Sequence, residues 1–128
     1  MAEWKVLITD RAWPDFEVES RLLDDIGATI IPATDTSEPE LISLARQAHA
    51  IMTCWAQVTA PVIEAAPSLK IVARYGIGLD NISVETATQR GIPVTYVPDY
   101  CVGEVSDHAL ALLLACARNI THFHVQLK

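Results

Sequence analysis

The sequence predicts an α/β fold in which helices cover both faces of a five-stranded parallel sheet. Short apolar runs alternate with helical patterns along the first 98 residues. The five runs predicted as strands are 4–8, 29–31, 50–53, 69–73 and 93–97. Their apolar residues are continuous rather than alternating, which is typical of strands that helices bury on both faces.

Two helices are predicted before the third strand. The first spans 16–26, and Gly27 is placed to end it in a left-handed conformation. Its apolar residues at helical spacing are Val18, Leu22, Leu23 and Ile26. The second begins at a capping box of Ser37 and Glu40, in which each side chain accepts the other residue's backbone N–H. Its expected inward stripe consists of Leu41, Leu44, Ala45 and Ala48.

Two shorter helices are predicted around the fourth strand. Thr59 precedes one of them, and Pro61 lies in its first turn. Ser83 precedes the other, and Gly91 ends it. Both segments lie between consecutive strands, which is where a parallel sheet needs its crossover connections.

The composition changes after Pro98. A long helix is expected from about Glu104, and its centre, 109–117, is apolar on every side. A helix at the surface of a small domain shows one polar face instead. We therefore expect one domain at 1–98, a connector with a helix at 99–128, and a further surface that covers this helix.

Charge and composition exclude several classes of partner. The formal net charge of −7 argues against binding nucleic acid or an anionic membrane through bulk electrostatics. The longest apolar run is far shorter than the ~20 residues that span a bilayer. The three cysteines, which have neither metal-ligand nor disulfide spacing, are Cys54, Cys101 and Cys116. With no leader pattern at the start, these features predict a soluble, cytoplasmic protein.

The most informative segment is 74–81 (R-Y-G-I-G-L-D-N), which follows the fourth strand. Two glycines at a strand end allow backbone N–H groups to approach an anion closely, and ligands of open α/β sheets bind at this edge. The G-x-G also begins a dinucleotide motif, but Asn81 replaces its third glycine. The next helix starts only near Ser83, too late to hold a pyrophosphate at this turn.

Three interpretations of this turn remain open: a dinucleotide loop, a purely structural turn, and a clamp for a small anion. In the clamp, the N–H groups of Ile77 and Gly78 hold a carboxylate. Arg74 either supplies a cation to the same anion or pairs with an acid such as Asp80.

Other polar residues show no catalytic or metal-binding pattern. Asp10 ends the first strand, as the phospho-acceptor of a receiver domain does, but no second acid stands beside it. Pro98 occupies the place of the lysine that a receiver requires. His122 and His124 are two residues apart and point to different sides of a helix, so a shared metal is not expected. We predict neither a catalytic residue nor a metal ligand in this chain.

Four motifs together resemble the amino-terminal part of the D-isomer-specific 2-hydroxyacid dehydrogenase family, which includes phosphoglycerate dehydrogenase. In order, they are 73–82 (A-R-Y-G-I-G-L-D-N-I), 91–94 (G-I-P-V), 97–100 (V-P-D-Y) and 104–114 (E-V-S-D-H-A-L-A-L-L-L). The resemblance covers nearly the whole chain. It implies a flavodoxin-like substrate domain at 1–98, a hinge, and a helix that crosses into a nucleotide-binding domain.

The resemblance also implies a substrate site and a partner. The loop of Gly76, Ile77 and Gly78, with Arg74 beside it, is expected to clamp the substrate carboxylate. The other residues that the resemblance places at the pocket are Cys54 and Trp55 in its wall, and Tyr100 and Cys101 at the hinge. No arginine and serine stand near Thr53 and Cys54, so phosphoglycerate is not the expected substrate. The helix from about Glu104 is expected to form a homodimer.

The family transfers a hydride between NAD or NADP and C2 of a 2-hydroxy or 2-keto acid. Its glycine fingerprint and its catalytic arginine, acid and histidine correspond to positions after Lys128, and none of His108, His122 or His124 replaces that histidine. The chain alone is therefore expected to be inactive and to bind no cofactor. The alternatives are a stand-alone flavodoxin-like module that binds a small carboxylate or a protein partner, and a structural interaction domain that uses the apolar helix.

Overall fold

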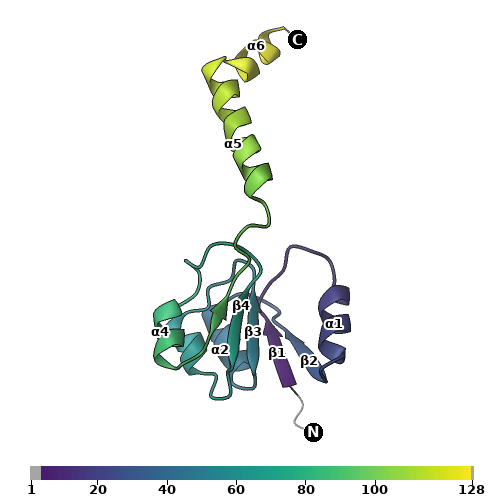
Figure 1. Ribbon diagram of the computed structural model, residues 1–128, viewed down its shortest axis with the longest axis vertical. Helices are drawn as coiled ribbons and strands as arrows, with labels where there is room; N and C mark the ends of the chain where they lie inside the picture. Colours follow the sequence, from purple (N-terminus) through teal and green to yellow (C-terminus); the bar gives the residue numbers. More distant parts are fainter. Residues whose placement is uncertain (1–3, 128) are drawn as a thin grey trace. The chain divides into compact units, whose positions relative to one another are not determined.

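The computed structural model of the chain describes residues 4–127. Five parallel strands form one sheet in the order β2-β1-β3-β4-β5 (Figure 1). The strands are β1 (Trp4–Ile8), β2 (Ala28–Pro32), β3 (Ala50–Thr53), β4 (Ile71–Arg74) and β5 (Val94–Thr95). Val6 at the centre of β1 lies opposite Ile30 on one side and Ala50 on the other. This is the doubly wound order of flavodoxin-like proteins, so the predicted fold class is confirmed.

Six helices are described, four of them in the first unit. The chain divides after Pro98 into two compact units, each with its own internal contacts. The helices of the first unit are α1 (Glu17–Asp24), α2 (Glu38–Ala45), α3 (Ala60–Glu64) and α4 (Val84–Gln89). The second unit contains α5 (Val102–Ala117) and α6 (Ile120–Gln126).

One face of the sheet, here called the covered face, carries the main core. Three helices, α2, α3 and α4, pack side by side over it. Leu7, Ile51 and Val72 from the three central strands are fully buried there. Leu41 and Ala45 of α2 are also fully buried, so the inward stripe predicted for this helix is present.

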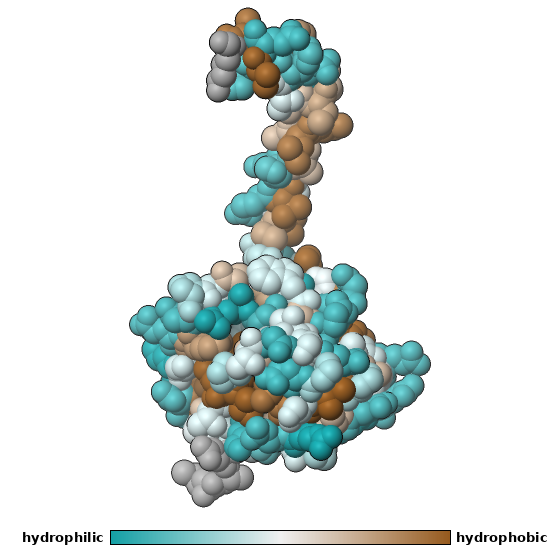
Figure 2. All heavy atoms as spheres, turned by 180° about the vertical axis from the view of Figure 1, so that it is seen from behind, coloured by the Kyte–Doolittle hydropathy of each residue, from teal (hydrophilic) through white to brown (hydrophobic). Residues whose placement is uncertain are grey.

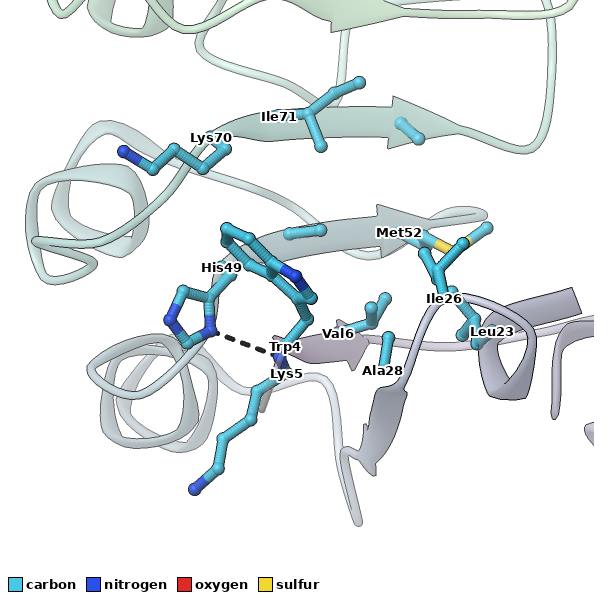
Figure 3. Close-up of a pocket in the computed structure, with 12 residues that line it drawn as sticks. Trp4, Lys5, Val6, Leu23, Ile26, Ala28, His49, Met52, Lys70 and Ile71 are labelled. Atoms are coloured by element: carbon cyan, nitrogen blue, oxygen red, sulfur yellow. Dashed lines mark hydrogen bonds between the residues drawn. The ribbon is translucent and has the colours of Figure 1, made fainter. Parts of the chain in front are cut away.

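The other face, here called the open face, is packed against α1. A smaller core of Val6, Ile8 and Ala28 lies beneath this helix. Beside it an apolar hollow of about 350 Å³ extends over β3 and β4. In Figure 3, Met52 and Ile71 lie at this hollow, with Leu23 and Ile26 at its edge.

The inward side of α1 differs from the predicted one. Val18, Leu22 and Ile26 are exposed, and Leu23 alone of the predicted stripe packs on the core. Glu19 is buried instead, because the hydroxyl of Tyr75 donates a hydrogen bond to its Oε1 at 3.0 Å. The contact between Glu19 and Tyr75, which follows β4, therefore sets the rotation of α1 about its axis. The spacing of hydrophobic residues could not predict this rotation.

The capping box predicted for α2 is absent. Ser37 does occupy the N-cap, but its side chain makes no capping bond to the helix. The N–H of Ser37 donates to Asp35 Oδ1 at 2.7 Å, so the donor that Glu40 was expected to satisfy is already used. Glu40 accepts from the hydroxyl of Thr34 instead, at 3.0 Å. The hydrogen bond from the Ser37 N–H to Asp35 thus replaces the one that the capping box would have formed.

The second unit consists of two exposed helices. Asn119, in a left-handed conformation with φ of 51°, separates α5 from α6. Apolar side chains follow α5 along its length (Figure 2), and none of its residues is buried. No helix in the described part of the chain is long and apolar enough to cross a bilayer.

Candidate functional site

The glycine-rich turn after β4 is held at both ends. The N–H of Tyr75 donates to the carbonyl of Thr53 at 2.9 Å, and the carbonyl of Gly76 accepts the N–H of Val97 at 3.1 Å. Further along, Leu79 packs against the core of the covered face. The turn is therefore anchored to β3, to the segment after β5 and to the core.

Between these anchors the backbone donors are free. Among residues 4–127, no acceptor receives the N–H of Ile77 or of Gly78. The side chain of Ile77 is exposed, so solvent or a ligand can approach the turn. Adjacent N–H groups on a turn form a concave surface that favours anions.

The side chain of Arg74 lies close over Gly76. A Cβ at residue 76 would lie 2.6 Å from Nη1 of this arginine, well inside contact distance. The guanidinium cannot move away freely, because its Nε donates to Asn81 Oδ1 at 3.0 Å. Among residues 4–127 the partner of Arg74 is therefore Asn81 and not Asp80, and its expected contact with the anion stays a prediction. Arg74 binds Asn81 and lies over the first glycine.

Asn81 links this turn to the loop after β3. Its Nδ2 donates to the carbonyl of Ala56 at 2.9 Å, and its own carbonyl accepts the N–H of Val58 at 2.8 Å. The side chain is buried, so these bonds form away from water and fix the spacing of the two loops. The sequence predicts that Asp80 and Asn81 brace the turn through local side-chain to backbone bonds. The Asn81 side chain does bond to the backbone, but its partner Ala56 lies 25 positions away and not within the turn.

Asp10, at the end of β1, holds the same loop from the other side. Its Oδ1 accepts the N–H of Cys54 at 2.9 Å and the hydroxyl of Thr9 at 2.8 Å. Its Oδ2 accepts the N–H of Trp55 at 2.7 Å and of Ala56 at 3.2 Å. Three successive backbone donors on one carboxylate are an anion nest that the protein fills itself.

These contacts shift the pKa values of Asp10 and Cys54. Partial burial alone would raise the pKa of Asp10, but the bonds from Cys54, Trp55, Thr9 and Ala56 outweigh it, and the pKa is lowered. Burial raises the pKa of the Cys54 thiol, and the Asp10 charge raises it further, against an opposing effect of Arg74. Cys54 is therefore a neutral thiol at pH 7 and not an activated nucleophile.

Six of the eight predicted site residues lie at the carboxyl ends of the adjacent strands β3 and β4. They are Cys54, Trp55, Arg74, Gly76, Ile77 and Gly78. Cys54 is buried, whereas Trp55 is 62 % exposed and presents its indole to solvent. Tyr100 and Cys101 belong to the second unit, so their part in this site stays a prediction.

The hollow of the open face is a different place. Its rim contains Trp4, His49 and Lys70, which lie at the amino ends of the strands (Figure 3). Its lining is almost wholly apolar, and Nδ1 of His49 already accepts the N–H of Lys5 at 3.1 Å. Small acids need several convergent polar groups, so the turn after β4 is the better candidate site.

The turn after β4 lacks the features of a dinucleotide-binding loop. No group of three metal-ligating side chains comes together within residues 4–127. The helix after the turn, α4, begins at Val84 and has only six residues. Its N-terminus is therefore eight positions beyond Gly76 and is not part of a G-x-G-x-x-G loop.

Comparisons with known proteins agree with this architecture. The family described as "D-isomer specific 2-hydroxyacid dehydrogenase, catalytic domain" matches residues 6–124. A D-3-phosphoglycerate dehydrogenase of Methanocaldococcus jannaschii is 37 % identical over 97 % of this chain and 23 % of its own length. A hydroxypyruvate reductase of Thermotoga maritima is 36 % identical over 100 % of this chain and 41 % of its own length.

A solved structure supports the fold in the same way. The D-lactate dehydrogenase of Aquifex aeolicus, complexed with NAD and lactic acid, superposes with a TM-score of 0.81 at 22 % identity. The superposition covers 97 % of this chain and 37 % of that one. The chain thus spans well under half the length of these relatives. Because the family match covers nearly all of its residues, the chain belongs to the D-isomer-specific 2-hydroxyacid dehydrogenase family.

Proposed function

We propose that this chain is the substrate-binding part of an NAD- or NADP-dependent D-2-hydroxyacid dehydrogenase. In this proposal the turn of Gly76, Ile77 and Gly78 binds the carboxylate of a 2-hydroxy or 2-keto acid. The observation that carries it is the pair of unpaired N–H groups at Ile77 and Gly78, at the strand edge where ligands of open α/β sheets bind. The lactic acid bound by the Aquifex aeolicus relative is a 2-hydroxy acid, which supports the substrate class.

The remaining site residues would orient the acid. Hydrogen bonds from backbone N–H to a carboxylate are charge-assisted and stronger than neutral ones. Arg74 lies over Gly76 and adds positive charge beside the turn. The exposed Trp55 supplies a bulky apolar wall. A nicotinamide held by other polypeptide would exchange the hydride with C2 of an acid oriented in this way.

Hydride transfer itself is assigned to cofactor-binding polypeptide outside these residues. The turn does not fit a dinucleotide, and no residue of the chain is assigned as the proton-transferring group. We therefore expect the 128-residue chain alone to be inactive and to bind neither NAD nor NADP. Isothermal titration with NADH and a spectrophotometric assay with pyruvate would both detect a departure from this expectation.

The clamp is tested by following backbone amides in NMR spectra. Pyruvate should shift the Ile77 and Gly78 amide resonances, whereas pyruvamide, which has the same size but no carboxylate, should not. Ile77→Pro removes one of the two donors and should weaken pyruvate binding by about tenfold. Ile77→Val keeps the donor and serves as the matched control. Equal shifts with pyruvate and pyruvamide, or none with either, would refute the clamp.

We also propose that α5 mediates a homodimer. Its exposed apolar residues include Leu110, Leu113 and Leu114, at positions i, i+3 and i+4 of one helix. Sedimentation velocity should give a dimer, and Leu113→Lys should shift it toward monomer. His108→Lys adds the same charge at a polar position of α5 and should leave the dimer intact. A monomer at all concentrations in the unmodified chain would contradict the proposal.

A further inference from the structure

Two groups of backbone donors lie at the ends of adjacent strands, and only one of them is filled. The N–H groups of residues 54–56, after β3, all donate to Asp10. The N–H groups of Ile77 and Gly78, after β4, donate to no acceptor in the described chain. An acid that enters this edge would meet two anion-binding surfaces if Asp10 did not occupy the first.

The filled nest is connected to the empty one. Besides its bond to Asp10, Ala56 accepts at its carbonyl from the Thr53 hydroxyl at 3.0 Å and from Asn81 Nδ2 at 2.9 Å. Asn81 in turn accepts from Nε of Arg74, which lies over Gly76. A continuous series of hydrogen bonds therefore runs from the Asp10 carboxylate to the arginine beside the proposed clamp.

The nest needs an anion to keep its shape. Three N–H dipoles that point toward one spot repel each other, and a negative charge at that spot removes the repulsion. The Asp10 carboxylate uses both oxygens for this purpose and accepts all three N–H groups of residues 54–56. The loop then presents Cys54 inward and Trp55 outward.

We propose that Asp10 is a positioning residue, an internal anion that closes the nest at 54–56 and so directs the substrate carboxylate to Ile77 and Gly78. The inference rests on the proposed function, since it concerns where the acid binds. It assigns to Asp10 two effects that a purely structural aspartate would not have. Removal of its carboxylate opens a second anion site, and an added anion restores the first.

The test compares three variants by amide NMR with formate and pyruvate as ligands. Asp10→Ala vacates the nest, and formate should then shift the amides of residues 54–56, which it does not shift in the unmodified chain. Pyruvate affinity at Ile77 and Gly78 should fall by about tenfold in Asp10→Ala and recover in part when formate is added. Asp10→Asn keeps the nest sterically filled but turns an amide N–H₂ toward a donor. It should lose the same affinity without recovery by formate.

Asp35→Asn is the matched control. It weakens a comparable bond, from the N–H of Ser37, in a loop elsewhere on the first unit, and should change neither formate nor pyruvate binding. If Asp10→Ala does not fold, Asp10→Asn alone tests the proposal: a loss of pyruvate affinity supports it, and unchanged affinity overturns it. The inference is overturned if pyruvate affinity is unchanged in either folded variant, or if formate never reaches 54–56 in Asp10→Ala. Failure of the proposed function looks different, because pyruvate would then shift no amide of the turn in the unmodified chain.

Discussion

The two faces of the sheet differ in burial although the same strands form both. On the covered face, α2, α3 and α4 completely bury the inward side chains Leu7, Ile51 and Val72 of the three central strands. On the open face, α1 packs over a smaller core, and Met52 and Ile71 line an apolar hollow. Ile51 and Met52 are neighbours on β3 but point to opposite faces, as strand geometry requires. Packing on one side of the sheet therefore accounts for most of its burial.

The most direct test of this difference replaces one isoleucine on each face by alanine. Ile51→Ala, on the covered face, should lower the free energy of unfolding by about 3–4 kcal/mol, since the side chain is fully buried. Ile71→Ala, on the neighbouring strand and the open face, should cost about 1 kcal/mol because the side chain is already partly exposed. Urea denaturation measures both. Equal losses would show that the two faces are equally packed.

A second prediction concerns the polar pair that holds α1 on the open face. Glu19 is only 7 % exposed; its Oε1 accepts the Tyr75 hydroxyl, and its Oε2 has no partner within the described residues. Burial raises the pKa of Tyr75, and the Glu19 hydrogen bond and charge raise it further, so the phenol stays protonated as the donor. Tyr75→Phe leaves a buried carboxylate unpaired and should cost about 2 kcal/mol.

The double variant separates this effect from lost packing. Phenylalanine keeps the ring that meets Trp13 edge to face, with centroids 4.8 Å apart. Adding Glu19→Met to Tyr75→Phe removes the unpaired carboxylate and should restore much of the stability, again in urea. If the double variant is no more stable than Tyr75→Phe, the polar pair does not fix α1.

Alanine substitutions at two glycines should lower the free energy of unfolding by the same amount on both faces of the sheet. Gly27 follows α1 and Gly91 follows α4, with φ of 67° and 66°. A Cβ at either position would meet nothing within 4 Å, so only the left-handed backbone penalises a substitution. Gly27→Ala and Gly91→Ala should each cost about 1 kcal/mol in thermal or urea unfolding. A much larger loss at one of them would indicate a packing constraint that the covered and open faces do not share.

The sequence predicted the covered face better than the open face, for a physical reason. Leu41 and Ala45 were placed correctly because a stripe that packs on a sheet follows the helical period. On α1 the same reasoning chose Val18, Leu22 and Ile26, which are exposed, since a single hydrogen bond from Tyr75 sets the rotation. Hydrophobic periodicity carries no information about a polar contact between residues 56 positions apart.

The candidate site was predicted in the same uneven way. The Gly76 to Gly78 turn could be located, because glycines at a strand end are a local signal. Asp10 and Asn81 could not, since their partners at Cys54 and Ala56 lie 44 and 25 positions away. What brings Asp10 beside the end of β3 is the strand order, in which β1 and β3 are neighbours. The contact between Asp10 and the loop after β3 can therefore be predicted only when the strand order is known.

The smallest expected effect is the loss of stability in acid that comes from Asp10. It tests the contribution of a charge at the strand ends, apart from the packing of the two faces. The pKa of Asp10 is lower in the folded protein than the ordinary pKa of an aspartate, so its carboxylate stabilises the fold at pH values above that ordinary pKa. The contribution is lost as pH falls through the lowered pKa. Because much of the side chain faces solvent, the loss should be modest, and Asp10→Asn should reduce the drop in urea midpoint between pH 5 and pH 2.

The same titration tests whether the faces themselves respond to acid. Ile51 and Ile71 carry no titratable group, so the difference in unfolding free energy between Ile51→Ala and Ile71→Ala should be the same at pH 3 as at pH 7. Asp35→Asn, which alters an exposed carboxylate whose pKa is lowered by the side chain and N–H of Ser37, provides the control. If the difference in unfolding free energy between the two isoleucine variants disappears at low pH, the Asp10 charge and the packing of the faces are coupled. The Asp10 nest would then support the covered core and not only the loop after β3.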